Sequence, residues 1–367
     1  MARNLIAQVD LSAIRHNYQL ARAQAPQARA VAIIKADAYG HGAIQVARSL
    51  ESEADAFGVA AIEEALELRD AGITRPVLLL EGFFETEELP LIQQHKLWTA
   101  LHSIEQLEKL EAYLERHPDS RGLHVWLKID SGMHRLGIEP ALAAGALQRL
   151  QALPAVEKLV VMSHFACADE PQRPHTERQL QQIDKAVAGH SVDLSLCNSA
   201  GVMHWPQAHQ QWLRPGIMLY GASPFTEPQT VASRLRPGMT LTTEIIAVRD
   251  VQAGESVGYG ASWVAEKPTR IGTLAVGYAD GYSRHAPSGT PVWLNGRRTA
   301  LAGRVSMDMS TIDLSLHPEA KPGDQVELWG ANVTVNEVAD WCGTIPYTLL
   351  SGLTRRVKRR YTDDQPF

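Results

Sequence analysis

The sequence predicts an α/β protein with two parts: a (β/α)8 barrel, followed by a smaller, mostly-β domain. In the first part, apolar strand-like segments recur eight times over roughly 220 residues with helical segments between them, which is typical of a parallel sheet covered by helices. After Arg236 the pattern changes to short strands divided by glycine and proline turns. We therefore expect the barrel over residues 1–236 and the β-domain over residues 237–367. An open doubly wound sheet is the alternative, but no G-x-G-x-x-G segment follows any of the strand-like segments.

Each strand-like segment of the first part is a short run of apolar, β-prone residues. The runs cover residues 31–35, 56–60, 77–80, 97–101, 123–129, 159–163, 192–196 and 216–220. Helical patterns lie between them, for example at residues 43–52, 62–70, 103–116, 140–152 and 175–188. Before the first run, an alternating segment within residues 1–10 predicts one more strand, and Ser12 is placed to cap a helix that runs to about Gln24.

The second part carries strand patterns separated by turn sequences. They cover residues 240–251, 270–276, 291–294, 297–301, 311–314 and 325–329, with one short helical pattern at 334–341. The pair Asn295-Gly296 lies between two of these runs and is a strong signal for a tight hairpin. The second part is therefore expected to be mostly β.

Composition argues against several classes of function. The net charge is −6, so no basic field attracts nucleic acid or an anionic membrane surface. The three cysteines show no metal-ligand spacing, so neither a disulfide scaffold nor a metal site is expected. No apolar run approaches the roughly 18 residues of a membrane span, and the first residues do not resemble a signal peptide. We expect a cytoplasmic protein.

The most informative segment is Val31–Gly42, in which an apolar run leads directly into Lys35. A short loop with a tyrosine, two glycines and a histidine follows. A lysine at the carboxyl end of a buried strand faces a site; desolvation there lowers its pKa and frees the amine as a nucleophile or as an imine partner. A surface lysine at the end of a strand is the alternative that this segment alone leaves open.

Other polar residues fall at the ends of later strand-like segments. Lys128 ends one of them with Arg135 in the loop beyond, His164 and Asn198-Ser199 follow two more, and Arg214 precedes the last. Taken singly, a histidine here is more often a core residue and an Asn-Ser pair a helix cap. Together they lie at the face where barrel enzymes hold their catalytic groups and, after the last two strands, phosphate. A lysine that forms an imine with an aldehyde cofactor then indicates pyridoxal phosphate.

The motifs resemble those of a known family. The segment V-A-I-I-K-A-D-A-Y-G-H-G around Lys35 is similar to the cofactor-lysine signature of alanine racemases, and K-I-D-S-G-M-H-R-L-G from Lys128 resembles their second signature. Further matching segments follow in the family's order, at residues 163–166, 198–199, 214–217, 257–260, 277–281, 303–308 and at Tyr347. The resemblance covers essentially the whole chain.

The resemblance implies a fold-type III pyridoxal phosphate enzyme with a barrel and a C-terminal β-domain. It implies a head-to-tail homodimer in which the β-domain of one subunit completes the barrel site of the other. It also implies that residues 1–10 pack with the C-terminal domain. The cofactor is expected as a covalent imine on Lys35, and the substrate as a small amino acid.

The resemblance also implies roles for individual residues. The two catalytic bases are Lys35 and Tyr259 of the partner subunit, which serve opposite faces of the substrate. The implied cofactor-binding residues are Lys35, Tyr39, His164, Asn198, Ser199, Arg214, Gly216, Ile217 and Tyr347. Arg135 and Met307 are expected to bind the substrate, and Lys128, Tyr278 and Arg304 to surround the site. In many family members the lysine that matches Lys128 is carbamylated and orients the arginine.

Three alternatives stay open at this point. An amino-acid decarboxylase of the same fold type normally places an acid against the ring nitrogen of the cofactor, where the resemblance puts Arg214. A broad-specificity amino-acid racemase would share the barrel motifs. A non-catalytic pyridoxal phosphate carrier would not need the β-domain with Tyr259 and Met307. Either a biosynthetic role, supplying D-alanine to the cell wall, or a catabolic one is compatible with the sequence.

Overall fold

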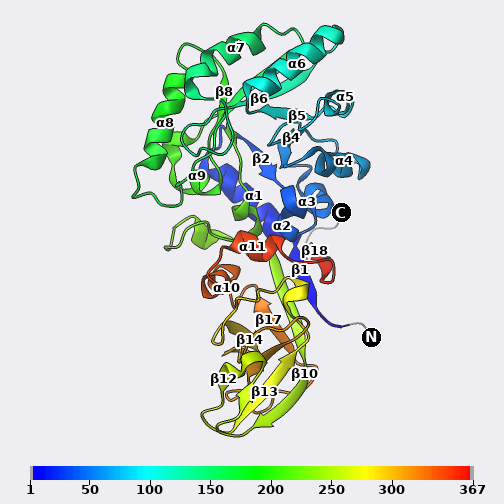
Figure 1. The fold of residues 1–367 in the computed structure, drawn as a ribbon, viewed down its shortest axis with the longest axis vertical. Helices are drawn as coiled ribbons and strands as arrows, with labels where there is room; N and C mark the ends of the chain where they lie inside the picture. The colour runs from blue at the N-terminus through cyan, green and yellow to red at the C-terminus, as the bar shows by residue number, and fades with distance from the viewer. Residues whose placement is uncertain (1–2, 364–367) are drawn as a thin grey trace.

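The computed structural model describes residues 3–363 and divides into a barrel and an elongated β-domain (Figure 1). Eight parallel strands form the barrel sheet in the order β8-β7-β6-β5-β4-β3-β2-β9. They are β2 (Arg29–Ile33), β3 (Ala56–Val59), β4 (Val77–Leu79), β5 (Trp98–Leu101), β6 (Leu123–Lys128), β7 (Val156–Met162), β8 (Asp193–Ser195) and β9 (Trp212–Leu213). Between the two end strands, the Arg214 N–H donates to Cys197 O (3.0 Å) and Ser195 Oγ donates to Trp212 O (3.0 Å). The sheet is therefore a nearly closed barrel, and the predicted fold class is confirmed.

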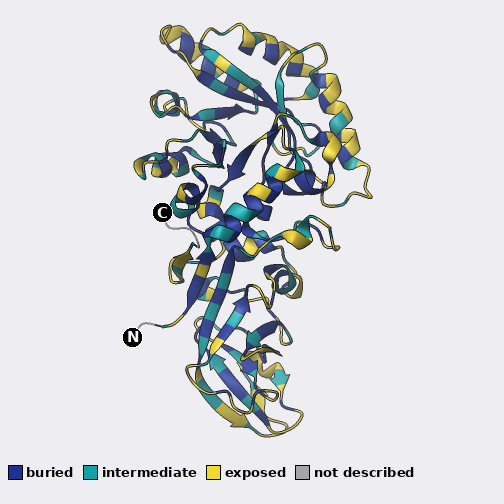
Figure 2. Cartoon of the chain, turned by 180° about the vertical axis from the view of Figure 1, so that it is seen from behind, coloured by how far each residue is buried: buried dark blue, intermediate teal, exposed yellow. Residues whose placement is uncertain are grey.

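Helices cover the outside of this sheet and bury one side each. They are α1 (Leu11–Gln24), α3 (Ala43–Leu50), α4 (Ile62–Asp70), α5 (Glu88–Gln94), α6 (Ile104–Arg116), α7 (Ala143–Gln151), α8 (His175–Ala186) and the short α9 (Ser199–His204). Figure 2 shows the pattern that results, with buried residues along the strands and exposed residues on the outer sides of the helices. Helix α6 begins as predicted, because Ser103 Oγ accepts the Gln106 N–H (3.1 Å). Helix α1 is capped by Asp10 rather than by Ser12, whose hydroxyl donates to Asp10 Oδ1.

The prediction of an eighth strand at residues 216–220 is wrong. The last barrel strand is β9, and Ile217–Tyr220 forms the 3₁₀ turn η3. Pro215 has no N–H to give to a sheet, so the hydrogen-bonded strand does not continue through it. The run Ile217–Tyr220 is fully buried, as expected of a core strand, but burial does not distinguish a strand from a buried turn.

The β-domain is built on one long strand, β10 (Met239–Val251). Its main sheet has the order β15-β14-β17-β10-β1-β18, and a further strand pair joins β10. These strands are β13 (Thr269–Leu274), β14 (Pro291–Leu294), β15 (Arg297–Ala300), β16 (Ser310–Asp313), β17 (Gln325–Trp329) and β18 (Lys358–Thr362), beside the two-residue β11 (Ser256–Val257) and β12 (Trp263–Val264). The predicted hairpin is present: Leu294 pairs with Arg297, and Asn295 and Gly296 both have positive φ, as a type I′ turn requires.

The two ends of the chain meet where the barrel joins the β-domain. Strand β1 (Ile6–Asp10) pairs antiparallel with β10 and parallel with β18. Helix α11 (Pro346–Ser351), which follows α10 (Val335–Trp341), lies at this junction beside α2 (Lys35–Gly40) (Figure 1). The first strand is thus part of the sheet of the β-domain, while the division of the chain at residue 236 stays a prediction. Within residues 3–363, the helices are too short or too polar to span a lipid bilayer.

Candidate functional site

A cavity of about 660 Å³ opens at the carboxyl ends of the barrel strands. Eleven of the residues singled out in the sequence line it: Lys35, Tyr39, Lys128, Arg135, His164, Asn198, Ser199, Arg214, Gly216, Ile217 and Tyr347. A volume of this size is typical of a site for a small molecule or cofactor. The parallel topology therefore brings residues that are far apart in the sequence together at the carboxyl ends of the strands.

Lys35 does not end strand β2 but begins an unusual turn. The strand stops at Ile33, and Ala36 to Tyr39 in α2 have φ near 53° and ψ of 41–50°, which is a turn of left-handed helix. For residues other than glycine this conformation costs roughly 1–2 kcal/mol each, so the surroundings must hold it. The sequence predicted only a loop here.

Contacts from distant segments stabilise this left-handed turn. The Ala36 N–H donates to Glu64 Oε1 (2.6 Å), and Arg359 Nε donates to the carbonyl of Gly40 (2.7 Å). Glu64 lies on α4 and Arg359 on β18. The turn that carries Lys35 and Tyr39 is therefore held by two separate elements, α4 and β18.

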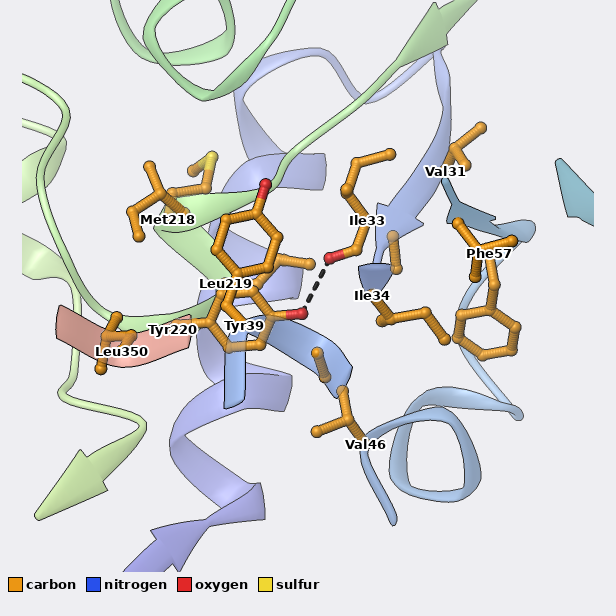
Figure 3. Packing of buried hydrophobic residues seen from close by; sticks show 14 of the residues in the cluster. Val31, Ile33, Ile34, Tyr39, Val46, Phe57, Met218, Leu219, Tyr220 and Leu350 are labelled. Carbon is orange, nitrogen blue, oxygen red and sulfur yellow. Dashed lines mark hydrogen bonds between the residues drawn. The ribbon is translucent and has the colours of Figure 1, made fainter. Parts of the chain in front are cut away.

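The ring of Tyr39 packs between two other tyrosines. Its centroid lies 4.8 Å from that of Tyr220 and 5.8 Å from that of Tyr347. Tyr220 in turn donates from Oη to the carbonyl of Ile33 (2.8 Å), as Figure 3 shows. Burial raises the pKa of Tyr39 to about 12, so its phenol stays protonated and can donate a hydrogen bond. A Cβ at Gly216 would lie 2.9 Å from Tyr39 Oη, so the absence of a side chain there leaves a space beside the phenol.

Asn198 and Ser199 shape the loop on the other side of that space. Asn198 caps α9 by accepting the Gly201 N–H (3.0 Å), which is the structural role considered for it in the sequence. Ser199 Oγ accepts the N–H groups of Gly216 (2.9 Å) and Met218 (3.3 Å). Both residues also line the cavity, so their structural role accompanies a place in the site.

The guanidinium of Arg214 is buried in the cavity wall, with 3% of the residue exposed. One terminal nitrogen donates to the carbonyl and the hydroxyl of Ser195 (2.6 Å each), and the other donates to the carbonyl of Ser163. Nε has no hydrogen bond within the described chain and is available to a group in the cavity. Burial lowers the pKa of Arg214 to about 10, which still leaves it charged at neutral pH.

Positive charge dominates the rest of the wall. Burial and then the charge of Arg214 lower the pKa of Lys128 to about 8. Burial, Arg214 and Arg135 hold the pKa of His164 well below its usual value, so this imidazole is neutral. The wall also contains Glu81, an acid that sequence reasoning missed although it directly follows the apolar run 77–80. The other lining residues not singled out are Ile33, Ala36, Leu80, Leu136, Met162 and Ser351.

Four residues expected in the same site do not line the cavity. Tyr259, Tyr278, Arg304 and Met307 lie in the β-domain, and all four are exposed. They lie on connected loops: Tyr278 N–H donates to Ser306 O (3.0 Å), and a Cβ at Gly260 would lie 3.1 Å from the guanidinium of Arg304. We call these four side chains the β-domain cluster. One chain therefore carries the expected site in two separate pieces.

A buried carboxylate supports the loops under the β-domain cluster. Asp280 is fully buried, and its side chain accepts the Gly277 N–H (3.0 Å). It also forms ion pairs with Arg3 and with Arg356, whose Nε lies 3.2 Å from Oδ1. Sequence reasoning did not single out Asp280, although it stands in the quoted segment 277–281.

Comparison with known proteins assigns the family. Two family models match, "Alanine racemase, N-terminal domain" over residues 9–224 and "Alanine racemase, C-terminal domain" over residues 238–361. The chain is 55% identical to the alanine racemase of Pseudomonas fluorescens, covering 95% of this chain and 96% of that one. It is 54% identical to the catabolic alanine racemase of Pseudomonas aeruginosa, with 97% and 98% covered.

A solved structure agrees with this assignment. The crystal structure of the biosynthetic alanine racemase of Pseudomonas aeruginosa superposes with a TM-score of 0.93, at 52% identity and with 98% and 99% of the two chains covered. The match spans both the barrel and the β-domain. The chain therefore belongs to the alanine racemases, the pyridoxal-phosphate-dependent isomerases that interconvert L- and D-alanine.

Proposed function

We propose that this enzyme racemises alanine with two opposed acid/base groups, Lys35 in the barrel and Tyr259 of the partner subunit. The observation that supports this most directly is the division of the expected site into two pieces. The barrel residues surround one cavity, whereas Tyr259 is 69% exposed on the β-domain. A homodimer in which each β-domain covers the cavity of the other subunit would unite them.

The cavity residues fit pyridoxal phosphate. The space beside Tyr39 Oη and Gly216, with Ser199, Ile217 and Tyr347 near it, suits the phosphate. The Nε of Arg214 and the neutral His164 suit the aromatic ring, and Lys35 would carry the cofactor covalently through Nζ. When bound, pyridoxal phosphate withdraws electrons from the substrate and so acidifies its α-proton.

The two bases would act on opposite faces of the α-carbon. Lys35, as the free amine, takes the α-proton from one face or returns it there, and Tyr259 of the partner subunit does the same on the other face. Arg135 would bind the carboxylate of the substrate, assisted by the backbone N–H of Met307 from the partner subunit. Tyr278 of the partner subunit would narrow the entrance, which would favour alanine over bulkier amino acids by about 1–3 kcal/mol per methylene.

Arg214 distinguishes this site from that of a decarboxylase. An arginine whose pKa is about 10 keeps its proton at neutral pH. It can donate a hydrogen bond to a ring nitrogen but does not readily protonate it, whereas an acid in the same place would share its proton. With pyridoxal phosphate bound, Arg214 would thus leave the ring nitrogen unprotonated, which would favour racemisation over decarboxylation.

We also propose that Lys128 is carbamylated. A lysine whose pKa is lowered to about 8 has a substantial fraction of neutral amine near neutral pH, and the neutral amine is the form that reacts with carbon dioxide. The carbamate would carry a negative charge toward Arg135 and orient it. The intact mass of the protein in bicarbonate buffer tests this: the mass of one added carbon dioxide is expected, and a bare amine at neutral pH would contradict it.

A circular-dichroism assay with each alanine enantiomer and a panel of other amino acids tests the function itself. We expect both enantiomers of alanine to lose optical activity until equal amounts are present. Similar rates for larger amino acids would favour a broad-specificity racemase, and no interconversion of alanine would refute the proposal. We place the enzyme in the cytoplasm, consistent with three unpaired, buried cysteines.

A further inference from the structure

His41 lies directly behind the left-handed turn and is fully buried. Its Nδ1 lies 3.0 Å from the carbonyl oxygen of Ala38 and 3.0 Å from that of Tyr39. Because both partners are acceptors, Nδ1 must carry the hydrogen, and this fixes the tautomer. The ring does not line the cavity, so His41 touches neither substrate nor cofactor.

The two carbonyls belong to the strained part of the turn. Ala38 and Tyr39 have φ of 52°, and the turn ends at Gly40 and Gly42, which also have positive φ. A donor that serves both carbonyls stabilises two adjacent peptide units in their left-handed arrangement. Glu64 holds the first residue of the turn and Arg359 its last carbonyl, whereas His41 holds the middle.

The ring of His41 also joins the aromatic stack. Its centroid lies 4.5 Å from that of Tyr220, which packs on Tyr39 at 4.8 Å. Tyr220 is bonded through Oη to Ile33 at the end of β2 (Figure 3). The histidine thus contacts the turn through hydrogen bonds, and it contacts the strand end before Lys35 through Tyr220.

We propose that His41 is a positioning residue for racemisation: its Nδ1–H holds the left-handed turn so that Lys35 and Tyr39 face the same cavity. This inference rests on the proposed roles of those two residues. Burial lowers the pKa of His41 to about 4, so the ring stays neutral and keeps its tautomer at neutral pH.

Three variants separate the hydrogen bond from the ring. His41→Asn can place its amide nitrogen near the position of Nδ1 and retain the donor, whereas His41→Gln carries its amide nitrogen farther out. His41→Phe keeps a ring against Tyr220 but has no donor. The donor is the feature that the inference requires, so the Asn variant should resemble the natural enzyme and the other two should not.

Two measurements on the full-length protein test this. The first is amide hydrogen exchange over residues 35–42, with and without added pyridoxal phosphate. The second is the deuterium isotope effect on kcat/KM with α-deuterated L-alanine and D-alanine. Loss of a buried hydrogen-bond donor should speed exchange in this segment about tenfold or more in His41→Phe and His41→Gln. The isotope effect should rise more in one direction of racemisation than in the other, because only one base is displaced.

The outcomes separate this inference from the proposed function. Unchanged exchange and unchanged isotope effects in His41→Phe would overturn the inference, as would equal defects in the Asn and Gln variants. If His41→Phe fails to fold, the comparison of His41→Asn with His41→Gln still tests the inference. Lys35→Ala serves as the reference: if it still racemises alanine, the proposed function fails, whatever the His41 variants do.

Discussion

The barrel and β-domain pieces of the site differ in how the chain holds their side chains. In the barrel, Arg214 and Ser199 are buried and bonded to neighbouring backbone. In the β-domain, the backbone of the loops is held firmly by Asp280, but Tyr259 and Met307 themselves are 69% and 54% exposed. The side chains of the barrel piece are therefore already held in position within one chain. Those of the β-domain cluster become enclosed only when another surface covers them.

The exposed cluster is informative because its side chains are large and partly apolar. A single exposed apolar residue is ordinary, but several on connected loops mark an interaction surface. In a symmetric dimer the same two pieces occur on both subunits, so one contact completes two sites. The following predictions separate the two pieces, beginning with the change expected to have the largest effect.

Removing the amine of the barrel piece should have the largest effect. Lys35→Ala should lower kcat/KM by about 10⁴-fold or more, because the covalent attachment and one base are lost together. The visible absorbance of the bound cofactor should disappear as well. Lys158→Ala is the matched control, since this lysine pairs with Asp193 away from the cavity. A Lys35→Ala enzyme with near-natural activity would remove Lys35 from the mechanism.

Removing the phenol of the β-domain piece should leave the cofactor in place. Tyr259→Phe should lower activity by about 10²–10⁴-fold, unequally in the two directions, because one of two acid/base groups is lost. The visible absorbance should stay close to that of the natural enzyme. Tyr113→Phe provides a control for removal of a phenol elsewhere, because the hydroxyl of Tyr113 on α6 donates to Gln93 and the residue does not line the cavity.

Co-expression of these two inactive variants tests whether the pieces come from different subunits. A mixed dimer of Lys35→Ala and Tyr259→Phe chains has one site with both defects and one with neither. With random pairing, about a quarter of all sites should therefore be intact and activity should return to that level. Failure of purified mixed dimers to regain activity would show that Lys35 and Tyr259 do not act across a shared site.

Disturbing the support beneath the β-domain cluster should have a smaller effect. Asp280→Asn removes the negative charge that pairs with Arg3 and Arg356. It also weakens the hydrogen bond that the Gly277 N–H donates to this side chain. A cost of about 1–3 kcal/mol in the free energy of unfolding is expected, because the arginines are partly exposed and can be hydrated. KM for alanine should rise while cofactor absorbance is retained. Asp308→Asn, which breaks an exposed pair with Arg356, should change KM far less.

Much of the barrel piece could be predicted because it follows one rule. Lys128, His164 and Asn198 lie at or just after strand ends, and the parallel topology brings strand ends together. The same rule would also have found Glu81, which directly follows an apolar run. Recognition of the two signature segments then supplied roles that position alone does not give.

Other features depend on contacts that no local pattern reports. The left-handed turn after Lys35 requires Glu64 and Arg359, which are 29 and 324 residues from that lysine. Likewise, the burial of Asp280 depends on arginines near both ends of the chain. The basic residues near the C-terminus indicated a solvated strand face, but K-R-R-Y-T has no apolar alternation that would set the bounds of β18, and its pairing comes from β1. The place of Tyr259 depends on a second chain, which a single sequence does not describe.

The last expected effect concerns the barrel piece alone and appears in the dependence of stability on pH, with no change in activity required. Burial lowers the pKa of His41 to about 4 in the folded protein, against about 6.5 when it is unfolded. Below pH 6.5 the unfolded chain takes up a proton at this residue while the folded chain does not. The free energy of unfolding should therefore fall as the pH falls from about 6.5 to about 4, by up to about 3 kcal/mol from this group.

Urea unfolding of the natural protein and of His41→Asn, at equal protein concentrations and at several pH values, isolates this contribution. The Asn variant retains the donor but cannot take up the proton, so the difference in unfolding free energy between the two proteins should change with pH. That change should favour the variant increasingly below pH 6.5 and level off near pH 4. Parallel curves would mean that His41 is protonated as easily in the folded protein as in the unfolded chain. The turn behind Lys35 would then be accessible to water. The barrel piece would not be fully formed within one chain, which would contradict the contrast drawn with the β-domain cluster.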